Sequence, residues 1–426
     1  MKTKSRSLLL AALTLIAAAP ALKAQLVIPS DGSDGDLIVA TNTVIDLSKA
    51  VTGSWDANND ANKGKGIYDS NKWAVVFKYS SVTISNGATL SFANHASRAP
   101  VVWLVKGDVN VLSGSLSVDG RDGTLPPFLA EPGPGGFRGG AGDFMPGVRL
   151  GPGFGPGGGQ GIGWDRSSGS YGSVGNNSTS VPYGNASLLP LIGGSGGSGD
   201  VDGGPDTSAS GGGGGGAMLI AAGGEVQVAA GASIRANGGS GWGGANSRHS
   251  AGGSGGGIRV ICSTLSGAGV VSASAGGGYR PGGLGRIRLE RVSNENTLQI
   301  TPDPSVVTLQ ALTAPLIWLP ADGPSVRIVS VGGQNAPADP RSGFGTLQPD
   351  VSIPSVSTAP VLLETRNVED ASSVIVRVSP RANGAYSETK ATVDQVVSTS
   401  PLVIRWTANV PVNAGYSALQ VKVVRP

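Results

Sequence analysis

Cysteine and histidine are both scarce in this chain of 426 residues, which has one cysteine, Cys262, and two histidines, His95 and His249. A single cysteine excludes an internal disulfide. Cys262 is in phase with Ile258 and Val260 in a short apolar stretch. We therefore predict that Cys262 is a small buried apolar residue rather than a reactive thiol.

Helix signals and long apolar runs are also absent from most of the chain. Its 70 glycines and 28 prolines interrupt any long helical period. Frequent Val, Thr, Ser and Ile in short stretches predict an all-β protein. No apolar run beyond the N-terminus is long enough to span a membrane, so we expect no transmembrane segment in the mature chain.

The N-terminus has the features of a secretory signal. A basic region with Lys2, Lys4 and Arg6 precedes an apolar stretch from Leu8 to Ala19, and Ala24 is a suitable cleavage position. We predict cleavage after Ala24 and a secreted or cell-surface location. The same signal is compatible with retention in the periplasm.

The positive net charge belongs to this predicted signal. Residues 1–24 contain four cationic and no acidic side chains, so their removal changes the net charge from +3 to −1. The mature chain has no cationic surplus of the kind that binds nucleic acid, and we expect no nucleic-acid partner.

A short pattern of apolar pairs around a glycine repeats along the chain. Each unit has two apolar residues at i and i+2, a glycine, and a second such pair. Three units are Val82/Ile84–Gly87–Leu90/Phe92, Val109/Val111–Gly114–Leu116/Val118 and Val226/Val228–Gly231–Ile234/Ala236. Residues at i and i+2 face one side of a strand, and glycine can adopt the positive φ of a tight corner. One unit cannot bury its apolar face alone, so the repeat predicts a parallel β-helix, or solenoid.

Glycine-rich inserts interrupt the repeat at equivalent places, after Val118, Ala236 and Ala273. Inserts that leave one corner of successive units pile up on one side, and we predict that this side is the interaction face. The longest insert, 124–216, carries aromatic residues that we expect to pin part of it to the strands. They are Phe128, Phe137, Phe144, Phe154, Trp164, Tyr171 and Tyr183.

Composition divides the mature chain into three parts. Residues 25–292 are the predicted β-helix, which begins with a cap formed by strands Leu37–Ala40 and Thr43–Leu47. Glycine then becomes rarer, and 293–324 is a predicted linker. Residues 325–426 contain short alternating strands that predict a small β-sandwich of the immunoglobulin or fibronectin type.

The pattern of 75–123 and 211–291 resembles the pectin-lyase-like parallel β-helix superfamily. More narrowly, it resembles glycine-rich secreted and surface proteins of Gram-negative bacteria, in which GGGGSGG loops precede I-x-[LV] strands. The resemblance covers about residues 37–292. It implies a fold that serves pectate lyases, polygalacturonases, adhesins and passenger domains, and the fold does not choose among them.

Catalytic signatures are sparse. The paired Asp-Asp and the Gly-His-Gly that such hydrolases use are absent. Arg286 and Arg288 alternate on one strand, which is typical of surface charge. The remaining candidates for catalysis are Asp119, Arg121 and Asp122 at the start of the first insert, where aspartate is also common as a turn former.

One loop has the spacing of a calcium site. Asp56, Asn58, Asp60 and Asn62 place oxygen ligands at alternate positions. The loop has Ala61 where an EF-hand has glycine, and an ordinary Asn/Asp turn explains the same residues. Calcium is the one cofactor that the sequence suggests.

These observations favour a secreted or cell-surface structural or adhesive protein that is not catalytic. Its expected partners are extracellular polysaccharide or other surface components, which it would meet through the glycine-rich face. Two alternatives stay open. One is a polysaccharide lyase or glycoside hydrolase on the same fold, and the other is a non-catalytic glycan-binding protein that uses Trp164 and Trp242.

Overall fold

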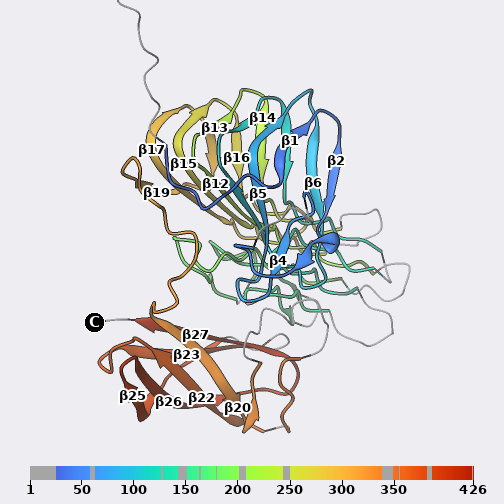
Figure 1. The fold of residues 1–426 in the computed structure, drawn as a ribbon. Helices are drawn as coiled ribbons and strands as arrows, with labels where there is room; N and C mark the ends of the chain where they lie inside the picture. Colours follow the sequence, from blue (N-terminus) through green and yellow to red (C-terminus); the bar gives the residue numbers. More distant parts are fainter. Residues whose placement is uncertain are drawn as a thin grey trace, which may run out of the picture.

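The computed structural model describes residues 25–57, 63–125, 128–142, 151–162, 165–178, 180–200, 208–242, 250–337, 349–354, 356–380, 386–424 and 426. Within these ranges the regular structure is β-strand, apart from the short 3-10 helix η1 (Leu47–Lys49). The all-β prediction is confirmed (Figure 1). The predicted signal peptide lies outside the described residues.

An eleven-stranded sheet runs the length of the N-terminal part, and we call it the long sheet. Its strands pair in parallel, except for an antiparallel pairing between β4 and β5. They are β1 (Gly35–Val39), β3 (Val51–Thr52), β4 (Ile67–Asp69), β5 (Ala74–Ile84), β7 (Val101–Val105), β8 (Val109–Val111), β12 (Ala217–Ala222), β13 (Glu225–Val228), β15 (Gly257–Gly267), β17 (Arg286–Asn296) and β19 (Ser305–Thr308).

A second, six-stranded sheet is parallel throughout, and we call it the short sheet. Each of its strands follows a strand of the long sheet in the chain, so the two sheets are built from the same repeating units (Figure 1). Its strands are β2 (Thr43–Asp46), β6 (Thr89–Ala93), β9 (Gly114–Ser117), β14 (Ala232–Arg235), β16 (Val270–Ser272) and β18 (Gln299–Thr301).

The apolar pairs of the sequence repeat are in register. In the long sheet Val109 pairs with both Val82 and Val226. In the short sheet Leu116 pairs with both Leu90 and Ile234. All twelve apolar positions of the three units are buried in one core between the sheets. The strand pairing that the repeat predicted is therefore confirmed for these units.

The glycine of each unit forms the corner between the two sheets. Gly87, Gly114 and Gly231 have φ values of 71°, 86° and 81°. L-residues with a Cβ atom pay a steric penalty in this region, which explains why glycine recurs here.

The parallel pairing continues beyond residue 292, where the sequence pattern placed the start of a linker. β17 runs to Asn296, and β18 and β19 pair with β16 and β17. Leu298 and Ile300 pack against the core of the parallel sheets. The predicted boundary was wrong because the change in composition marks the end of the glycine inserts, whereas strand pairing needs only the apolar alternation that follows.

Two antiparallel sheets make up the C-terminal part. Five strands form one sheet and three form the other, and side chains from both share a core that includes Leu363, Val376 and Trp406. The strands are β20 (Ser325–Val331), β21 (Gln334–Asn335), β22 (Thr358–Arg366), β23 (Ser373–Pro380), β24 (Ser387–Lys390), β25 (Thr392–Thr399), β26 (Leu402–Pro411) and β27 (Ser417–Val424).

Candidate functional site

The glycine-rich inserts lie together beside the ends of the short-sheet strands β9, β14 and β16 (Figure 1). The N–H of Gly120 donates to Asn237, and the N–H of Gly238 donates to Ser274. The predicted stacking of the inserts on one side is confirmed. We call this assembly the glycine lattice; it comprises residues 118–125, 130–142, 151–160, 167–175, 193–200, 208–216, 236–242, 250–257 and 273–285. It also carries a small hairpin of β10 (Gly161–Ile162) and β11 (Asp165–Arg166).

Hydrogen bonds in the lattice repeat every three residues. In the central segment 211–216, the N–H groups of Gly211 and Gly214 donate to Gly140 and Phe137. Those of Gly212 and Gly215 donate to Ala251 and Ser254, and those of Gly213 and Gly216 donate to Arg121 and Val118. One segment therefore bonds three neighbours in turn. This is the period of the polyproline II helix, which has three residues per turn and no internal hydrogen bonds.

Side chains have no room inside the lattice. A Cβ atom on Gly214 would lie 2.0 Å from the carbonyl oxygen of Gly194, and one on Gly139 would lie 1.9 Å from that of Gly211. Neighbouring backbones are thus in direct contact. The glycine content reflects this packing rather than chain flexibility.

Aromatic side chains hold the long insert in place. Phe137, Tyr171 and Tyr183 form a buried cluster with Leu188, and the two tyrosine hydroxyls donate to the carbonyls of Ile192 and Gly193. Burial raises the pKa of Tyr171. The predicted pinning is therefore confirmed for these residues.

The other aromatics of this insert behave differently. Phe154 is partly buried against the cluster, and Phe128 is 70% exposed. Phe144 and Trp164 lie outside the described residues. Trp242, in a neighbouring segment, is half-buried, and its backbone N–H donates to the Ser250 hydroxyl.

The candidate catalytic residues begin the first lattice segment. The Asp119 carboxylate accepts from the N–H of Asn237 at 2.6 Å and lies 3.0 Å from the Arg235 guanidinium. The Asp122 carboxylate accepts from the N–H of Ser240 at 2.7 Å. The two carboxylates are thus three residues apart, which is one period of the lattice, and each accepts a hydrogen bond from the backbone of the neighbouring segment. The backbone of Arg121 accepts from Gly213 in the same lattice.

The candidate calcium loop is described only in part. Asp56 is exposed and accepts a hydrogen bond from the Ser54 hydroxyl, which lowers the pKa of this carboxyl. Asn58, Asp60 and Asn62 lie outside the described residues. Elsewhere in the described ranges, no three His, Cys, Asp or Glu side chains come together in a group that could hold a metal ion.

Cys262 and His95 are both held in packed surroundings. Cys262 is 1% exposed, and burial raises the pKa of its thiol to about 12. The predicted burial of this residue is confirmed. His95 stacks on Tyr68 with ring centroids 4.1 Å apart, and partial burial lowers its pKa. His249 lies outside the described residues.

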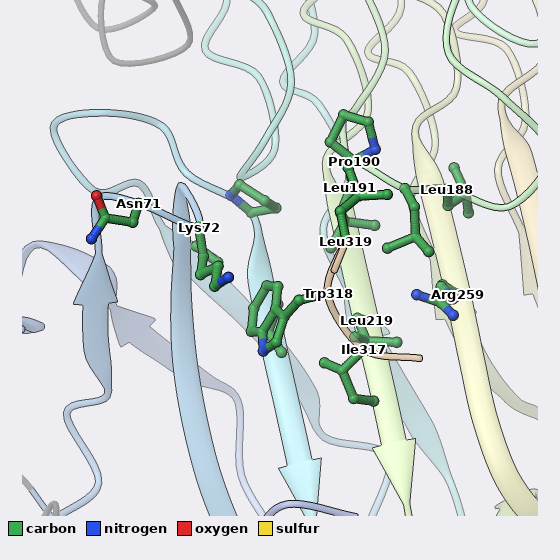
Figure 2. Close-up of a pocket in the computed structure, with 14 residues that line it drawn as sticks. Asn71, Lys72, Leu188, Pro190, Leu191, Leu219, Arg259, Ile317, Trp318 and Leu319 are labelled. Atoms are coloured by element: carbon green, nitrogen blue, oxygen red, sulfur yellow. The ribbon is translucent and has the colours of Figure 1, made fainter. Parts of the chain in front are cut away.

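A pocket of about 180 Å³ lies against the outer face of the long sheet. Its floor includes Val102 on β7, Leu219 on β12 and Arg259 on β15, which are neighbours in register. Two segments cover this floor, 188–191 of the long insert and 317–319 of the chain after β19 (Figure 2). Neither the sequence repeat nor the glycine-rich inserts indicated this pocket.

Arg259 is a buried charged residue in the floor of this pocket. It is 2% exposed, its Nε donates to Glu290 at 2.8 Å, and its Nη2 donates to the carbonyl of Leu316 at 2.7 Å. Burial lowers the pKa of the guanidinium, and the charge of Glu290 opposes that shift. A single arginine inside the apolar run GIRVI was the signal for this site in the sequence.

Arg286 and Arg288 do not face open solvent as the alternation suggested. The Arg286 guanidinium donates to the carbonyl of Tyr183 and lies over the Tyr171 ring, with 5.5 Å between its carbon and the ring centroid. Arg288 donates to Glu290 at 3.2 Å. Both arginines therefore help to attach neighbouring segments to the long sheet.

Comparisons with protein-family models, with curated proteins and with solved structures found no match to this chain. Among the described residues, no helix has the length and apolar character needed to cross a membrane.

Proposed function

We propose that this protein is a secreted or cell-surface protein with a structural or adhesive role, and that it acts through the edge of the glycine lattice. We propose also that the two parallel sheets are sides of a parallel β-helix of the pectin-lyase-like kind, and that the C-terminal sheets form a β-sandwich module. In-register parallel pairing and the glycine corners support the first assignment. The core shared by two antiparallel sheets supports the second.

The observation that carries the proposed role is the backbone packing of the lattice. Its N–H groups already bond neighbouring segments, and its Cα atoms lie against neighbouring carbonyls. Such a lattice offers a preformed platform that loses little conformational entropy when a partner binds its edge. The Asp119 and Asp122 carboxylates serve this packing, which favours a non-catalytic role over a lyase or hydrolase.

Exposed apolar side chains stand at the tips of the lattice segments. Gly123 bonds Ser240, and Gly241 bonds Gly277, so the outer ends of three successive inserts are stacked. Beyond these ends, Leu125 is 39%, Phe128 70% and Tyr279 53% exposed. Aromatic and aliphatic side chains on a rigid support are suited to contact sugar rings or other surface components.

The test uses the chain without residues 1–24, incubated with acidic and neutral polysaccharides, with and without calcium. We expect retention on a polysaccharide or in the cell-surface fraction, with no fall in solution viscosity. A fall in viscosity with new chain ends would establish the lyase or hydrolase alternative. Absence from both the polysaccharide and the surface fraction would contradict the proposed role.

A pair of variants locates the contact surface. The double variant Phe128→Ser/Tyr279→Ser removes exposed aromatic area at the lattice tips and should reduce retention. The matched control is Val306→Ser/Leu312→Ser, because these residues are 47% and 76% exposed but lie outside the lattice. Equal retention of the two double variants would show that the lattice tips are not the contact surface.

A further inference from the structure

The pocket on the long sheet is large enough for one ring-sized molecule. Its volume is about 180 Å³, and an apolar cavity of about 150 Å³ accommodates benzene. Leu219 on the floor, Leu188 and Leu191 in one covering segment and Ile317 in the other make most of the lining apolar (Figure 2). The body of a fitting ligand is therefore apolar.

Two residues that line this pocket each carry a buried donor atom that has no acceptor among the described residues. They are Nη1 of Arg259 and the indole Nε1 of Trp318. Figure 2 shows Trp318 between Arg259 on one side and Lys72 on the other. A buried donor without a partner destabilises the folded protein, and a bound acceptor would relieve that cost once the side chain turns its donor toward the pocket. The polar end of a fitting ligand is therefore an acceptor.

The ion pairs behind the floor leave an excess of positive charge. Glu290 is the shared partner of two cations, Arg259 at 2.8 Å and Arg288 at 3.2 Å. One carboxylate therefore faces two guanidinium groups that stay protonated in proteins. An anion next to Arg259 would balance the second charge.

A third cation lies at the other side of the pocket. The Lys72 ammonium is 5.8 Å from the centroid of the Trp318 ring. The nearby Asp69 carboxylate accepts from the backbone N–H groups of Trp55, Asn71 and Lys72, so it is engaged in the turn below. The charges around the pocket thus favour an anionic ligand over a neutral or cationic one.

We propose that this pocket binds a small organic monocarboxylate whose apolar body is about the size of one ring. The carboxylate accepts from the Arg259 guanidinium, which turns toward it, while the body packs between Leu219 and the covering segments. This inference does not rest on the adhesive role, and each can fail without the other.

The probes are benzoate and cyclohexanecarboxylate, measured by titration calorimetry on the mature chain. We expect saturable binding at one site per chain. Benzyl alcohol, which keeps the ring but lacks the charge, should bind about tenfold more weakly or worse, because its neutral oxygen is attracted to the guanidinium less strongly than a carboxylate. Acetate, which lacks the body, should also bind more weakly. Absence of saturable binding by both ring acids would overturn the proposal, and so would equal affinity for the acid and the alcohol.

The variant that tests the site is Arg259→Met/Glu290→Gln, which removes both members of the buried pair. It leaves Arg288 without its carboxylate partner, but the Arg288 side chain is 18% exposed and reaches solvent. The variant should lose benzoate binding by about tenfold or more. The matched control, Arg327→Met/Glu364→Gln, changes an ion pair in the C-terminal part and should bind as the parent does. Trp318 is half-buried, so Trp318→Leu is a milder change. Its benzoate affinity tests the site if the first variant fails to fold. Unchanged binding in a folded variant would place the ligand elsewhere and refute this assignment.

Discussion

Glycine residues do two different jobs in this molecule. At the corners, Gly87 and Gly231 have positive φ but open space where a Cβ atom would stand. In the lattice, a Cβ atom added to Gly214 would lie 2.0 Å from the carbonyl oxygen of Gly194. The first job requires a backbone conformation, and the second requires the absence of a side chain.

Alanine substitutions should separate these two jobs. We expect Gly231→Ala to lower the free energy of unfolding by about 1–2 kcal/mol, the cost of a left-handed conformation for an L-residue. Gly214→Ala should cost clearly more, because a backbone segment would have to move. Urea unfolding of the two variants measures the difference. The control for Gly231→Ala is Gly333→Ala, because Gly333 in the C-terminal part also has a positive φ and open space around it. Equal costs for Gly214→Ala and Gly231→Ala would contradict the close packing of the lattice.

His95 should make stability depend on pH. Its pKa in the folded state is lowered from 6.5 by burial, so the unfolded chain binds the proton more readily. The free energy of unfolding should therefore decrease as the pH falls below 6.5, and this contribution should be complete once the pH is below the folded pKa. His95→Gln should flatten the stability profile between pH 7.5 and 5.5. The control is His249→Gln, which should keep the slope. If the slope persisted in His95→Gln and disappeared in His249→Gln, the pH dependence would come from His249 and the prediction would be wrong.

At the scale of elements, the sequence predicted the strands well because their signal is local. Val109 and Val111 alternate with polar residues, and Gly114 follows at a fixed distance, so both the strand and its corner could be inferred. The burial of Cys262 followed from the same alternation. The end of the parallel pairing was misplaced because Leu298 and Ile300 lack the glycine context of the earlier units.

The lattice and the pocket could not be predicted in the same way. Hydrogen bonds in the lattice join Gly212 to Ala251 and Gly213 to Arg121, and no side chain marks which segments will be neighbours. The pocket needs Leu191 and Trp318, which are far apart in the chain, to cover Arg259. Only the unusual position of an arginine in an apolar strand was visible beforehand.

The aromatic cluster should control the order of the long insert independently of the sheets. Tyr171→Ala/Tyr183→Ala removes two buried rings, a change that typically costs several kcal/mol for each ring. We expect faster hydrogen exchange in 180–192, while exchange in β12 and β15 stays slow. Tyr279→Ala removes an exposed ring and should leave both regions unchanged. If exchange in β12 increased as much as that in 180–192, the insert and the sheets would be one cooperative unit.

At the scale of the whole molecule, side-chain hydrogen bonds join the C-terminal part to the rest of the chain. The Gln160 side chain donates to the carbonyl of Pro380, and Arg377 donates to that of Pro182 at 3.5 Å. Both contacts involve the long insert rather than the parallel sheets (Figure 1). The two parts have separate apolar cores, one around Trp103 and one around Trp406.

Cys262 can report on the parallel sheets alone, because it is the one cysteine of the chain. Its buried thiol, with a pKa of about 12, should not react with a disulfide reagent at pH 8 until these sheets open. Removal of residues 325–426 should change the free energy of that opening by about 1 kcal/mol or less for each hydrogen bond lost. Thiol labelling in increasing urea measures this for both chains. Rapid labelling of the shortened chain without urea would show instead that the C-terminal part holds the sheets together.

The close packing of the glycine lattice also limits how this protein can diversify. A mutation within segment 211–216 introduces a Cβ atom where a carbonyl oxygen stands, so the interior tolerates almost no change of residue type. A further glycine-rich segment, by contrast, could join the outside of the lattice through backbone hydrogen bonds alone, with no matching side chains required. Evolution of such a surface should therefore proceed by gain and loss of whole inserts, and new specificities should arise at their tips.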